Sequence, residues 1–339
     1  MKNHSLIGKA MLVAFVFLIA ASSASAAGKK YGLFVGINAY GGGINQLKGC
    51  VNDATKMRDA MVTKFGFNAA DTTLLTDAAA TREAILANLQ KYQALAGPGD
   101  LLVFHYSGHG TLFPDAYSDE QDETKLIYME TTNDKGETEV MYERATYDSA
   151  IVPVNAMDRS GKAWRSLILD DELYAIFSAV TRKGAQAVLI SDSCHSGTID
   201  KAKKSDAQRR ETPLVAVFGA RRYSDIDFGQ PAAKSARLTP PPIKGLYIAM
   251  TGSKDDEFSL DANIGGVPMG LFTNRILANI PATAAERVKM TYAQLMAKVS
   301  ADVSAQAIKW EGNQNPQLEA EFGNPSAPIF TVPGFRAGK

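Results

Sequence analysis

The alternation of short apolar runs with amphipathic helical segments constrains the fold more than any other feature. Runs rich in branched and aromatic side chains, long enough for buried strands, occur at residues 31–37, 72–75, 101–106, 187–191, 246–250 and 328–332. Segments with apolar side chains at helical spacing occur at residues 53–65, 81–96, 170–180, 270–280 and 291–306. This order predicts an α/β fold with a mostly parallel central sheet flanked by helices.

Two stretches interrupt the alternation. Residues 111–165 hold an acidic segment, with eleven Asp or Glu against three Lys or Arg between Asp115 and Asp148, and are expected to form an exposed insertion of hairpins or loops. Residues 200–244 are basic and then proline-rich, and they are expected to form an exposed, partly disordered linker.

The N-terminus has the pattern of an export signal. A basic start precedes an apolar run at residues 10–21, and Ala24-Ser25-Ala26 resembles a cleavage site. The run is too short to cross a bilayer, so a cleaved signal at 1–26 is favoured over an uncleaved anchor. We therefore expect a periplasmic or extracellular protein without stable membrane insertion.

The charge balance argues against one class of partner, and the cysteine content raises the question of a disulfide. Without residues 1–26 the chain keeps 34 basic and 36 acidic residues, a balance that argues against a nucleic-acid partner. In an exported chain, Cys50 and Cys194, the two cysteines present, could form a disulfide. That interpretation competes with a catalytic role for Cys194.

Small polar clusters follow three of the predicted strands, at the end of the sheet where α/β folds place ligand sites. They are GCVND at 49–53, SGHG at 107–110 and DSCHSG at 192–197. His109 stands between two glycines and Cys194 among small residues, so both are expected to be accessible rather than placed for packing. By contrast, His105 on its strand is expected to pack in the core, and His195 to face away from Cys194.

Cys194 and His109 suit acyl transfer by a thiolate. A nearby imidazole lowers the pKa of a thiol or protonates the leaving amine. The backbone N–H groups of Gly110 and Cys194 are expected to stabilise the oxyanion, an effect of about 3 kcal/mol per donor.

These clusters resemble the catalytic signatures of the metacaspases, the caspase relatives of plants, protists, fungi and bacteria. Within that family, the chain resembles a type I-like bacterial member. Further resembling motifs, in the same order, are SLILDDEL at 166–173, TGSKDDEFSLD at 251–261, GGVPMGLFT at 265–273 and NPQLE at 315–319. The resemblance covers nearly the whole mature chain. It implies a caspase-like three-layer fold and a cysteine endopeptidase.

The resemblance also implies roles for single residues. Cys194 would be the nucleophile and His109 the general acid/base. The S1 pocket, which receives the substrate residue before the scissile bond (P1), would be formed by Asp53, Asp192, Cys50 and Ser107. Two carboxylates there would bind Arg or Lys and disfavour Asp. The expected partners are therefore proteins or peptides with Arg or Lys at P1, and the enzyme is expected to be a monomer.

Family members of this type often bind calcium, although the chemistry itself needs no cofactor. Asp170 and Asp171 match the adjacent acidic pair of that site, and Asn155 stands where the family has an acid. An amide oxygen can still serve as a ligand to Ca²⁺. The alternative interpretation of Asp170 and Asp171 is an acidic helix start that complements the dipole.

The resemblance divides the mature chain into a large-subunit region at 27–199, the linker at 200–244 and a small-subunit region at 245–339, with both regions forming one domain. An enzyme that prefers basic P1 residues would find sites for self-cleavage in the linker, at 201–204, at Arg209–Arg210 and at Arg221–Arg222.

Other functions remain open. A catalytically silent caspase-fold scaffold is disfavoured because the Cys–His pair and the S1 acids are intact. A thiol–disulfide oxidoreductase is disfavoured because C-x-x-C is absent. A zinc site would need ligands from His105, His109, Cys194 and His195, whose spacing does not fit such a site. A disulfide between Cys50 and Cys194 could act as a redox switch.

Overall fold

The structure is a computed structural model. It describes residues 28–114, 125–132, 138–145, 147–156, 166–194, 207–210, 212, 217, 243, 245–254, 257–310, 312–320 and 323–332. The expected signal segment therefore lies outside the described residues. In the part of the chain that is described, no helix is both long and apolar enough to cross a membrane.

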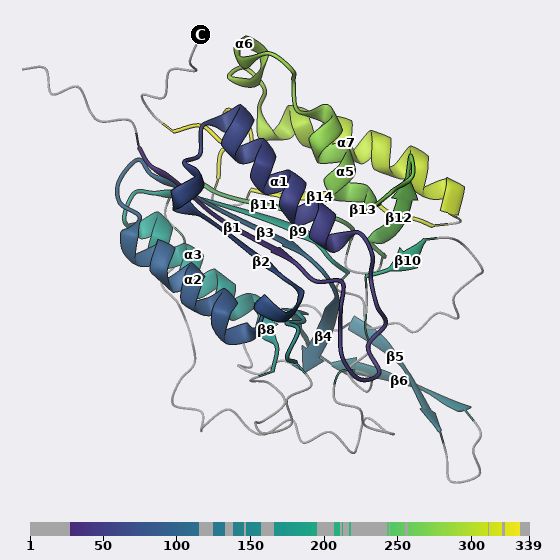
Figure 1. Cartoon of the computed structure of the whole chain (residues 1–339). Helices are drawn as coiled ribbons and strands as arrows, with labels where there is room; N and C mark the ends of the chain where they lie inside the picture. Colours follow the sequence, from purple (N-terminus) through teal and green to yellow (C-terminus); the bar gives the residue numbers. More distant parts are fainter. Residues whose placement is uncertain are drawn as a thin grey trace, which may run out of the picture.

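A central sheet of six strands organises the molecule (Figure 1). From one edge to the other its strands are β14 (Gln317–Glu319), β11 (Tyr247–Thr251), β9 (Gln186–Asp192), β3 (Leu101–Ser107), β1 (Lys30–Gly36) and β2 (Thr72–Thr76). The pairs from β11 to β2 are parallel, and β14 runs antiparallel to β11. The predicted mostly parallel α/β sheet is confirmed.

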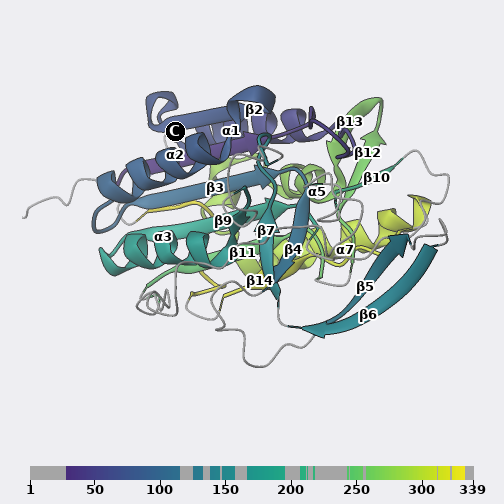
Figure 2. The same ribbon diagram turned by 90° about the horizontal axis from the view of Figure 1, so that it is seen from below.

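Helices cover both faces of this sheet (Figures 1 and 2). On one face lie α2 (Arg82–Leu95) and α3 (Asp170–Arg182), and on the other lie α1 (Cys50–Phe65), α5 (Leu271–Asn279) and α7 (Tyr292–Ala307), with the short α6 (Ala284–Arg287) between the last two. Because successive side chains of a strand point to opposite faces, β3 sends Leu102 and Phe104 into the first layer and Leu101 and Val103 into the second. Buried parallel strands explain the continuous apolar runs of the sequence.

Smaller sheets surround the carboxyl ends of the central strands. One contains β4 (Gly110–Pro114), β7 (Tyr147–Ile151) and β8 (Ile168–Leu169), and another contains β10 (Gln208–Arg209), β12 (Leu260–Ile264) and β13 (Val267–Gly270). The hairpin of β5 (Lys125–Thr132) and β6 (Thr138–Ala145) projects from the body in both views (Figures 1 and 2).

Three expectations from the sequence need correction. Of the stretch 111–165, predicted to be exposed, Phe113 and Ile151 are buried, because β4, β7 and β8 pack against the core. Of the linker, predicted to be exposed, Arg210 is fully buried. The strand predicted at 328–332 is absent: Pro328 makes an isolated bridge to Thr291, and the apolar residues that follow fill the core without joining the sheet.

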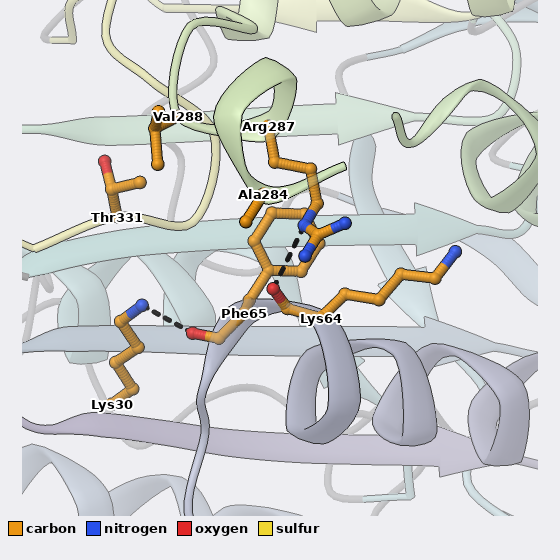
Figure 3. Close-up of a pocket in the computed structure, with 7 residues that line it drawn as sticks. All are labelled: Lys30, Lys64, Phe65, Ala284, Arg287, Val288 and Thr331. Carbon is orange, nitrogen blue, oxygen red and sulfur yellow. Dashed lines mark hydrogen bonds between the residues drawn. The ribbon is translucent and has the colours of Figure 1, made fainter. Parts of the chain in front are cut away.

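A pocket lies near the amino-terminal end of β1, and its charged side chains stabilise the fold (Figure 3). The Lys30 ammonium donates to the carbonyl of Phe65 (2.6 Å), and the Arg287 Nε donates to the carbonyl of Lys64 (3.1 Å). Both acceptors belong to the last turn of α1, whose carbonyls carry the negative end of the helix dipole. These cations stabilise a helix terminus, which accounts for their presence in the pocket.

Candidate active site

Two neighbouring strands carry the predicted cysteine and histidine to one place. In the parallel register of β3 and β9, Ser107 pairs with Asp192, and both are the last residues of their strands. His109 and Cys194 each follow two residues later, so they leave the sheet side by side. Contrary to the accessibility expected from the sequence, both side chains are fully buried, because the backbones of Arg210 and Ser259 are hydrogen-bonded against this segment.

The residues after the strands create a pair of backbone donors. The N–H groups of Gly110 and Cys194 both donate to the carbonyl oxygen of Arg210, at 3.0 and 3.2 Å. A Cβ atom at position 110 would lie 1.8 Å from the carbonyl oxygen of Cys194, so the approach requires glycine. Two converging N–H groups are the arrangement that stabilises an oxyanion in acyl transfer.

The surroundings of His109 determine its tautomer. Its Nε2 lies 2.7 Å from the carbonyl oxygen of Asn45. A carbonyl oxygen can only accept, so Nε2 carries the proton and Nδ1 presents a lone pair. Among the described residues, Nδ1 has no hydrogen-bond partner. Tyr40 fixes the position of His109, since its hydroxyl accepts from the His109 N–H (2.9 Å) and its ring packs on the imidazole.

Burial keeps this imidazole neutral. It lowers the pKa of His109 to about 4, although the contact with the Asn45 carbonyl acts in the opposite direction. Above that pH the ring is therefore a base with an available Nδ1 rather than a cation.

The backbone of Ser259 holds the sulfur of Cys194. The Ser259 N–H donates to Sγ (2.8 Å), and Sγ lies 3.5 Å from the Ser259 carbonyl oxygen. An N–H donor favours negative charge on sulfur, because hydrogen bonding to the charged form stabilises it.

Next to these groups is a buried acidic pocket, and Arg210 fills it. The guanidinium lies 2.7 Å from Asp53, 3.2 Å from Asp192 and 3.4 Å from Asp261, and all of these side chains are buried. Its Nη1 also donates to the Ser107 hydroxyl (2.6 Å). The pocket thus combines three carboxylates around one cation, an arrangement that suits a guanidinium.

Backbone and hydroxyl donors orient the carboxylates. The Gly270 N–H contacts both oxygens of Asp53 at 3.0 Å, and Thr273 donates to Asp192 from its N–H (2.9 Å) and its hydroxyl (2.7 Å). A Cβ atom at position 270 would lie 2.2 Å from an Asp192 oxygen and 2.6 Å from Nη1 of Arg210, so only glycine leaves room for the guanidinium.

The buried negative charge of this pocket favours the binding of a cation. Burial raises the pKa of Asp53 to about 7, a rise that the Arg210 guanidinium opposes and the Asp192 charge reinforces. Burial pulls the pKa of Arg210 down, but the surrounding acids outweigh it and hold that pKa above its ordinary value. The Asp53 carboxylate therefore depends on a cation to remain ionised near neutral pH.

Backbone hydrogen bonds hold the chain on both sides of Arg210. Gln208 and Arg209 form β10, which pairs antiparallel with β12. The Arg210 N–H donates to the Ser259 carbonyl (3.1 Å), and beyond it the Thr212 N–H donates to the Gly110 carbonyl (3.2 Å). A segment added as a strand to a sheet edge is a common mode of peptide recognition.

The structure brings the residues predicted for the S1 pocket together. Ser107 and Asp53 share a hydrogen bond (2.8 Å), and Cys50 begins α1 three residues before Asp53. Burial raises the pKa of the Cys50 thiol well above its usual value, against the effect of Arg210. Cys50 and Cys194 are present as two buried thiols, so the alternative of a disulfide is not formed here.

The histidines of the zinc alternative point to other partners. His105 is buried, with Nε2 at 3.3 Å from the Thr273 hydroxyl, as its expected core position requires. The Nε2 of His109 is bonded to Asn45. His195 lies outside the described residues.

Sequence reasoning missed three residues of this site. Asp261, Ser259 and Asn45 contact Arg210, Cys194 and His109, respectively, from segments distant in the chain. The motif at 251–261 is evident in the sequence, but nothing local indicates that β12 packs against the start of α1. Asp261 makes that contact by accepting the N–H groups of Lys48 (2.6 Å) and Gly49 (3.2 Å).

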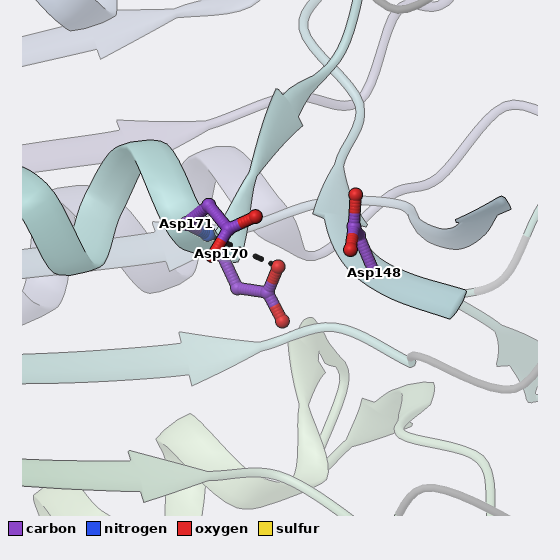
Figure 4. Close-up of side chains that lie close together, drawn as sticks. All are labelled: Asp148, Asp170 and Asp171. Carbon is purple, nitrogen blue, oxygen red and sulfur yellow. Dashed lines mark hydrogen bonds between the residues drawn. The ribbon is translucent and has the colours of Figure 1, made fainter. Parts of the chain in front are cut away.

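A second acidic cluster lies at the start of α3 (Figure 4). Carboxylate oxygens of Asp148, Asp170 and Asp171 lie within 4.8 Å of one another, and Asp148 is buried. Carboxylate oxygens are the ligands that Ca²⁺ prefers, so the donor set fits that ion. Asp170 and Asp171 are the pair that the sequence predicts for such a cluster.

Asn155, the third predicted ligand, is placed elsewhere. Its Oδ1 accepts the N–H of Arg82 (2.9 Å), and its Nδ2 donates to Glu83 (2.9 Å). Both ends of the amide are thus engaged at the N-terminus of α2, and Asp148 from β7 takes the third position of the cluster instead.

Comparison with known proteins gives matches over most of the chain. The model of the caspase domain family, Peptidase_C14, matches residues 29–324. Metacaspase-1 of Meyerozyma guilliermondii is 35% identical over 324 residues, covering 86% of this chain and 70% of its own. Metacaspase-1A of Aspergillus fumigatus is 28% identical over 325 residues, covering 86% and 68%. The crystal structure of a Geobacter sulfurreducens protein superimposes with a TM-score of 0.59 at 24% identity, covering 90% of this chain and 99% of that one.

Proposed function

Because this chain belongs to the caspase family of cysteine peptidases, we propose that it is an endopeptidase that cleaves after Arg or Lys, with Cys194 as nucleophile and His109 as general acid/base. One observation carries the proposal: Arg210 occupies the acidic pocket while its carbonyl accepts from Gly110 and Cys194. A P1 residue in the proposed mechanism would take this position before its bond is cleaved.

The proposed reaction begins with proton transfer. Nδ1 of neutral His109 takes the proton of Cys194, and the thiolate attacks the carbonyl carbon of P1. The oxyanion develops between the N–H groups of Gly110 and Cys194. The imidazolium then protonates the leaving amine, and water hydrolyses the thioester to release the acid and regenerate the thiol.

P1 selectivity follows from the charge of the pocket. Asp53, Asp192 and Asp261 face one cation in a site without solvent exposure. A P1 carboxylate would add negative charge to this buried cluster, at a cost of several kcal/mol. We therefore expect cleavage after Arg and Lys but not after Asp.

The same geometry makes the Arg210–Glu211 bond the site of self-cleavage that we propose among the basic pairs of the linker. The carbonyl of this bond is the one bound between the two donors. The segment is part of the same chain, so the first cut is intramolecular, and its rate constant is independent of protein concentration. After the cut, release of the segment opens the site to other substrates.

We further propose that Asp148, Asp170 and Asp171 hold a calcium ion. When bound, the ion would neutralise these carboxylates and tie β7 to the start of α3. The test is titration calorimetry with Ca²⁺ on the Cys194→Ala protein, in which self-cleavage cannot interfere. Loss of the binding heat in Asp148→Asn, with retention in Asn155→Ala, is expected; binding unchanged in Asp148→Asn would contradict the site.

Export of the protein is proposed from the signal-like segment at 1–26. Mass analysis of protein recovered after secretion should give a first residue near Ala27. An intact N-terminus on the recovered protein would refute cleavage of the segment.

Hydrolysis of fluorogenic peptides that end in Arg, Lys or Asp tests the main proposal. Release is expected from the Arg and Lys peptides, with loss of at least a thousandfold in Cys194→Ala. The fragments of the chain itself should end at Arg210 and begin at Glu211. Hydrolysis of the Asp peptide alone, or a fragment pattern unchanged in Cys194→Ala, would refute it.

A further inference from the structure

The residue before Arg210 makes its own specific contact. The guanidinium carbon of Arg209 lies 3.9 Å from the centroid of the Phe258 ring. A guanidinium within about 6 Å of an aromatic face is attracted by the negative charge of that face. An aliphatic side chain at position 258 would provide the same apolar surface without this attraction.

Phe258 is followed in the chain by Ser259, whose backbone is held in place by Arg210 and Cys194. Its neighbour Ser259 accepts the Arg210 N–H (3.1 Å) and donates to the sulfur of Cys194 (2.8 Å), and it is fully buried. In the antiparallel ladder, Arg209 pairs with Leu260. The same strand edge therefore sets the position of Arg210 in the acidic pocket and that of Arg209 on the ring.

We propose that Phe258 is a specificity-determining residue that selects a cationic side chain at P2, the position before P1. The preferred substrates then carry two consecutive basic residues, as Arg209–Arg210 does. This inference rests on the proposed endopeptidase function and extends it, because the acidic pocket alone accepts any segment with a single Arg.

Two peptides that differ only at P2 provide the test. Both carry Arg at P1, and P2 is either Arg or citrulline, which has nearly the same shape but no charge. The intact protein receives both peptides in one mixture, so the ratio of their kcat/KM values is independent of how often the chain's own segment fills the site. A preference of about five- to tenfold for Arg is expected.

Variants at position 258 then assign the preference to the ring. In Phe258→Leu the ratio should fall to about 1, because an aliphatic side chain lacks the charge distribution of the ring. In Phe258→Trp it should remain or increase, since indole is the strongest partner for a cation. Retention of the full preference in Phe258→Leu would overturn the role of Phe258.

The outcomes separate this inference from the function on which it rests. Equal rates for the two peptides in the intact protein overturn the P2 inference and leave the endopeptidase in place, even where Phe258→Leu fails to fold. Absence of hydrolysis of both peptides overturns the endopeptidase itself. In the chain's own cleavage, Arg209→Lys should keep the rate at Arg210, and Arg209→Gln should lower it by about the same five- to tenfold.

Discussion

At the scale of single residues, the three carboxylates of the acidic pocket differ in the hydrogen-bond donors that hold them. Asp53 and Asp192 are each held by donors from the far side of the pocket, at Gly270 and Thr273. Asp261 differs, because one of its oxygens faces Arg210 (3.4 Å) while the other accepts from the loop before α1. It therefore links cation binding to the position of that loop.

Asp261→Asn is expected to lower kcat/KM for Arg peptides by at least about tenfold, since a hydrogen bond to a charged group contributes about 1.5 to 3 kcal/mol. The amide keeps the shape but loses the charge. Steady-state kinetics on Arg peptides measures the effect, with Asp302→Asn as control, because Asp302 contacts Asn279 away from the pocket. Equal kinetics in the two variants would exclude a role of Asp261 in P1 binding.

The depressed pKa of His109 predicts a dependence of stability on pH. The ordinary pKa of a histidine side chain is 6.5 and that of His109 in the folded protein is about 4, so between these values the unfolded chain binds more protons. The free energy of unfolding must then rise with pH in this window, by about 3 kcal/mol at most, and this stability is lost as pH falls toward 4.

Urea unfolding of the Cys194→Ala protein at pH 5 and pH 7, with and without a second change His109→Gln, isolates this contribution. Titration of Asp53 and His105 is common to both proteins and cancels in the comparison. We expect the second change to reduce the gain in stability from pH 5 to pH 7. An identical gain in both proteins would mean that His109 is solvated.

At the scale of elements, the site depends on how strands and helices end. The parallel register of β3 and β9 aligns their last residues, and β12 supplies the edge that holds β10. Helix α1 contributes Asp53 from its first turn and is anchored at its other end by Lys30 and Arg287. Both ends of α1 thus determine the position of the Asp53 carboxylate.

Lys30 offers a test of that anchor. Burial lowers its pKa from 10.5 to about 8, so between these values the unfolded chain binds more protons and the free energy of unfolding rises with pH. Lys30→Met should remove this rise between pH 8 and pH 10, as measured by urea unfolding. Lys64→Met serves as control, because the Lys64 side chain is exposed at the same end of α1; loss of the rise in Lys64→Met alone would contradict the assignment.

At the scale of the whole molecule, the chain fills the active site that we propose for it. Arg210 belongs to the stretch between the two regions that form the central sheet, and it is fully buried in the pocket. A substrate in solution must displace this segment or wait for its cleavage. The intact chain is therefore expected to react more slowly than one in which the segment cannot bind.

Arg210→Gln should expose Cys194. The neutral side chain loses its ion pairs with three acids, so the segment leaves the site more often. We expect alkylation of Cys194 by an arginyl chloromethyl ketone to become about tenfold faster than in the parent protein, followed by mass spectrometry. Arg222→Gln, elsewhere in the linker, is the control, and equal acceleration in both variants would contradict specific occlusion.

The sequence alone determined the class of fold and indicated the pair that we propose to react. Apolar runs and helical spacing depend on local order, so they predicted the parallel sheet, its covering helices and the positions of Cys194 and His109 at strand ends. The apolar pattern at 328–332 was misread as a strand because burial in a core and burial in a sheet give the same short pattern. Local sequence records that a residue is buried, but not what buries it.

Tertiary structure alone decided which groups surround that pair. Asp261, Ser259, Phe258 and Asn45 reach the site from segments that no local pattern connects, and Asp148 replaces Asn155 in the acidic cluster for the same reason. The charged sequence of the linker likewise predicted an exposed segment. Arg210 is nevertheless buried, because three carboxylates from separate elements compensate its charge. A charge can be buried only where its partners converge, and that convergence is a property of the folded chain.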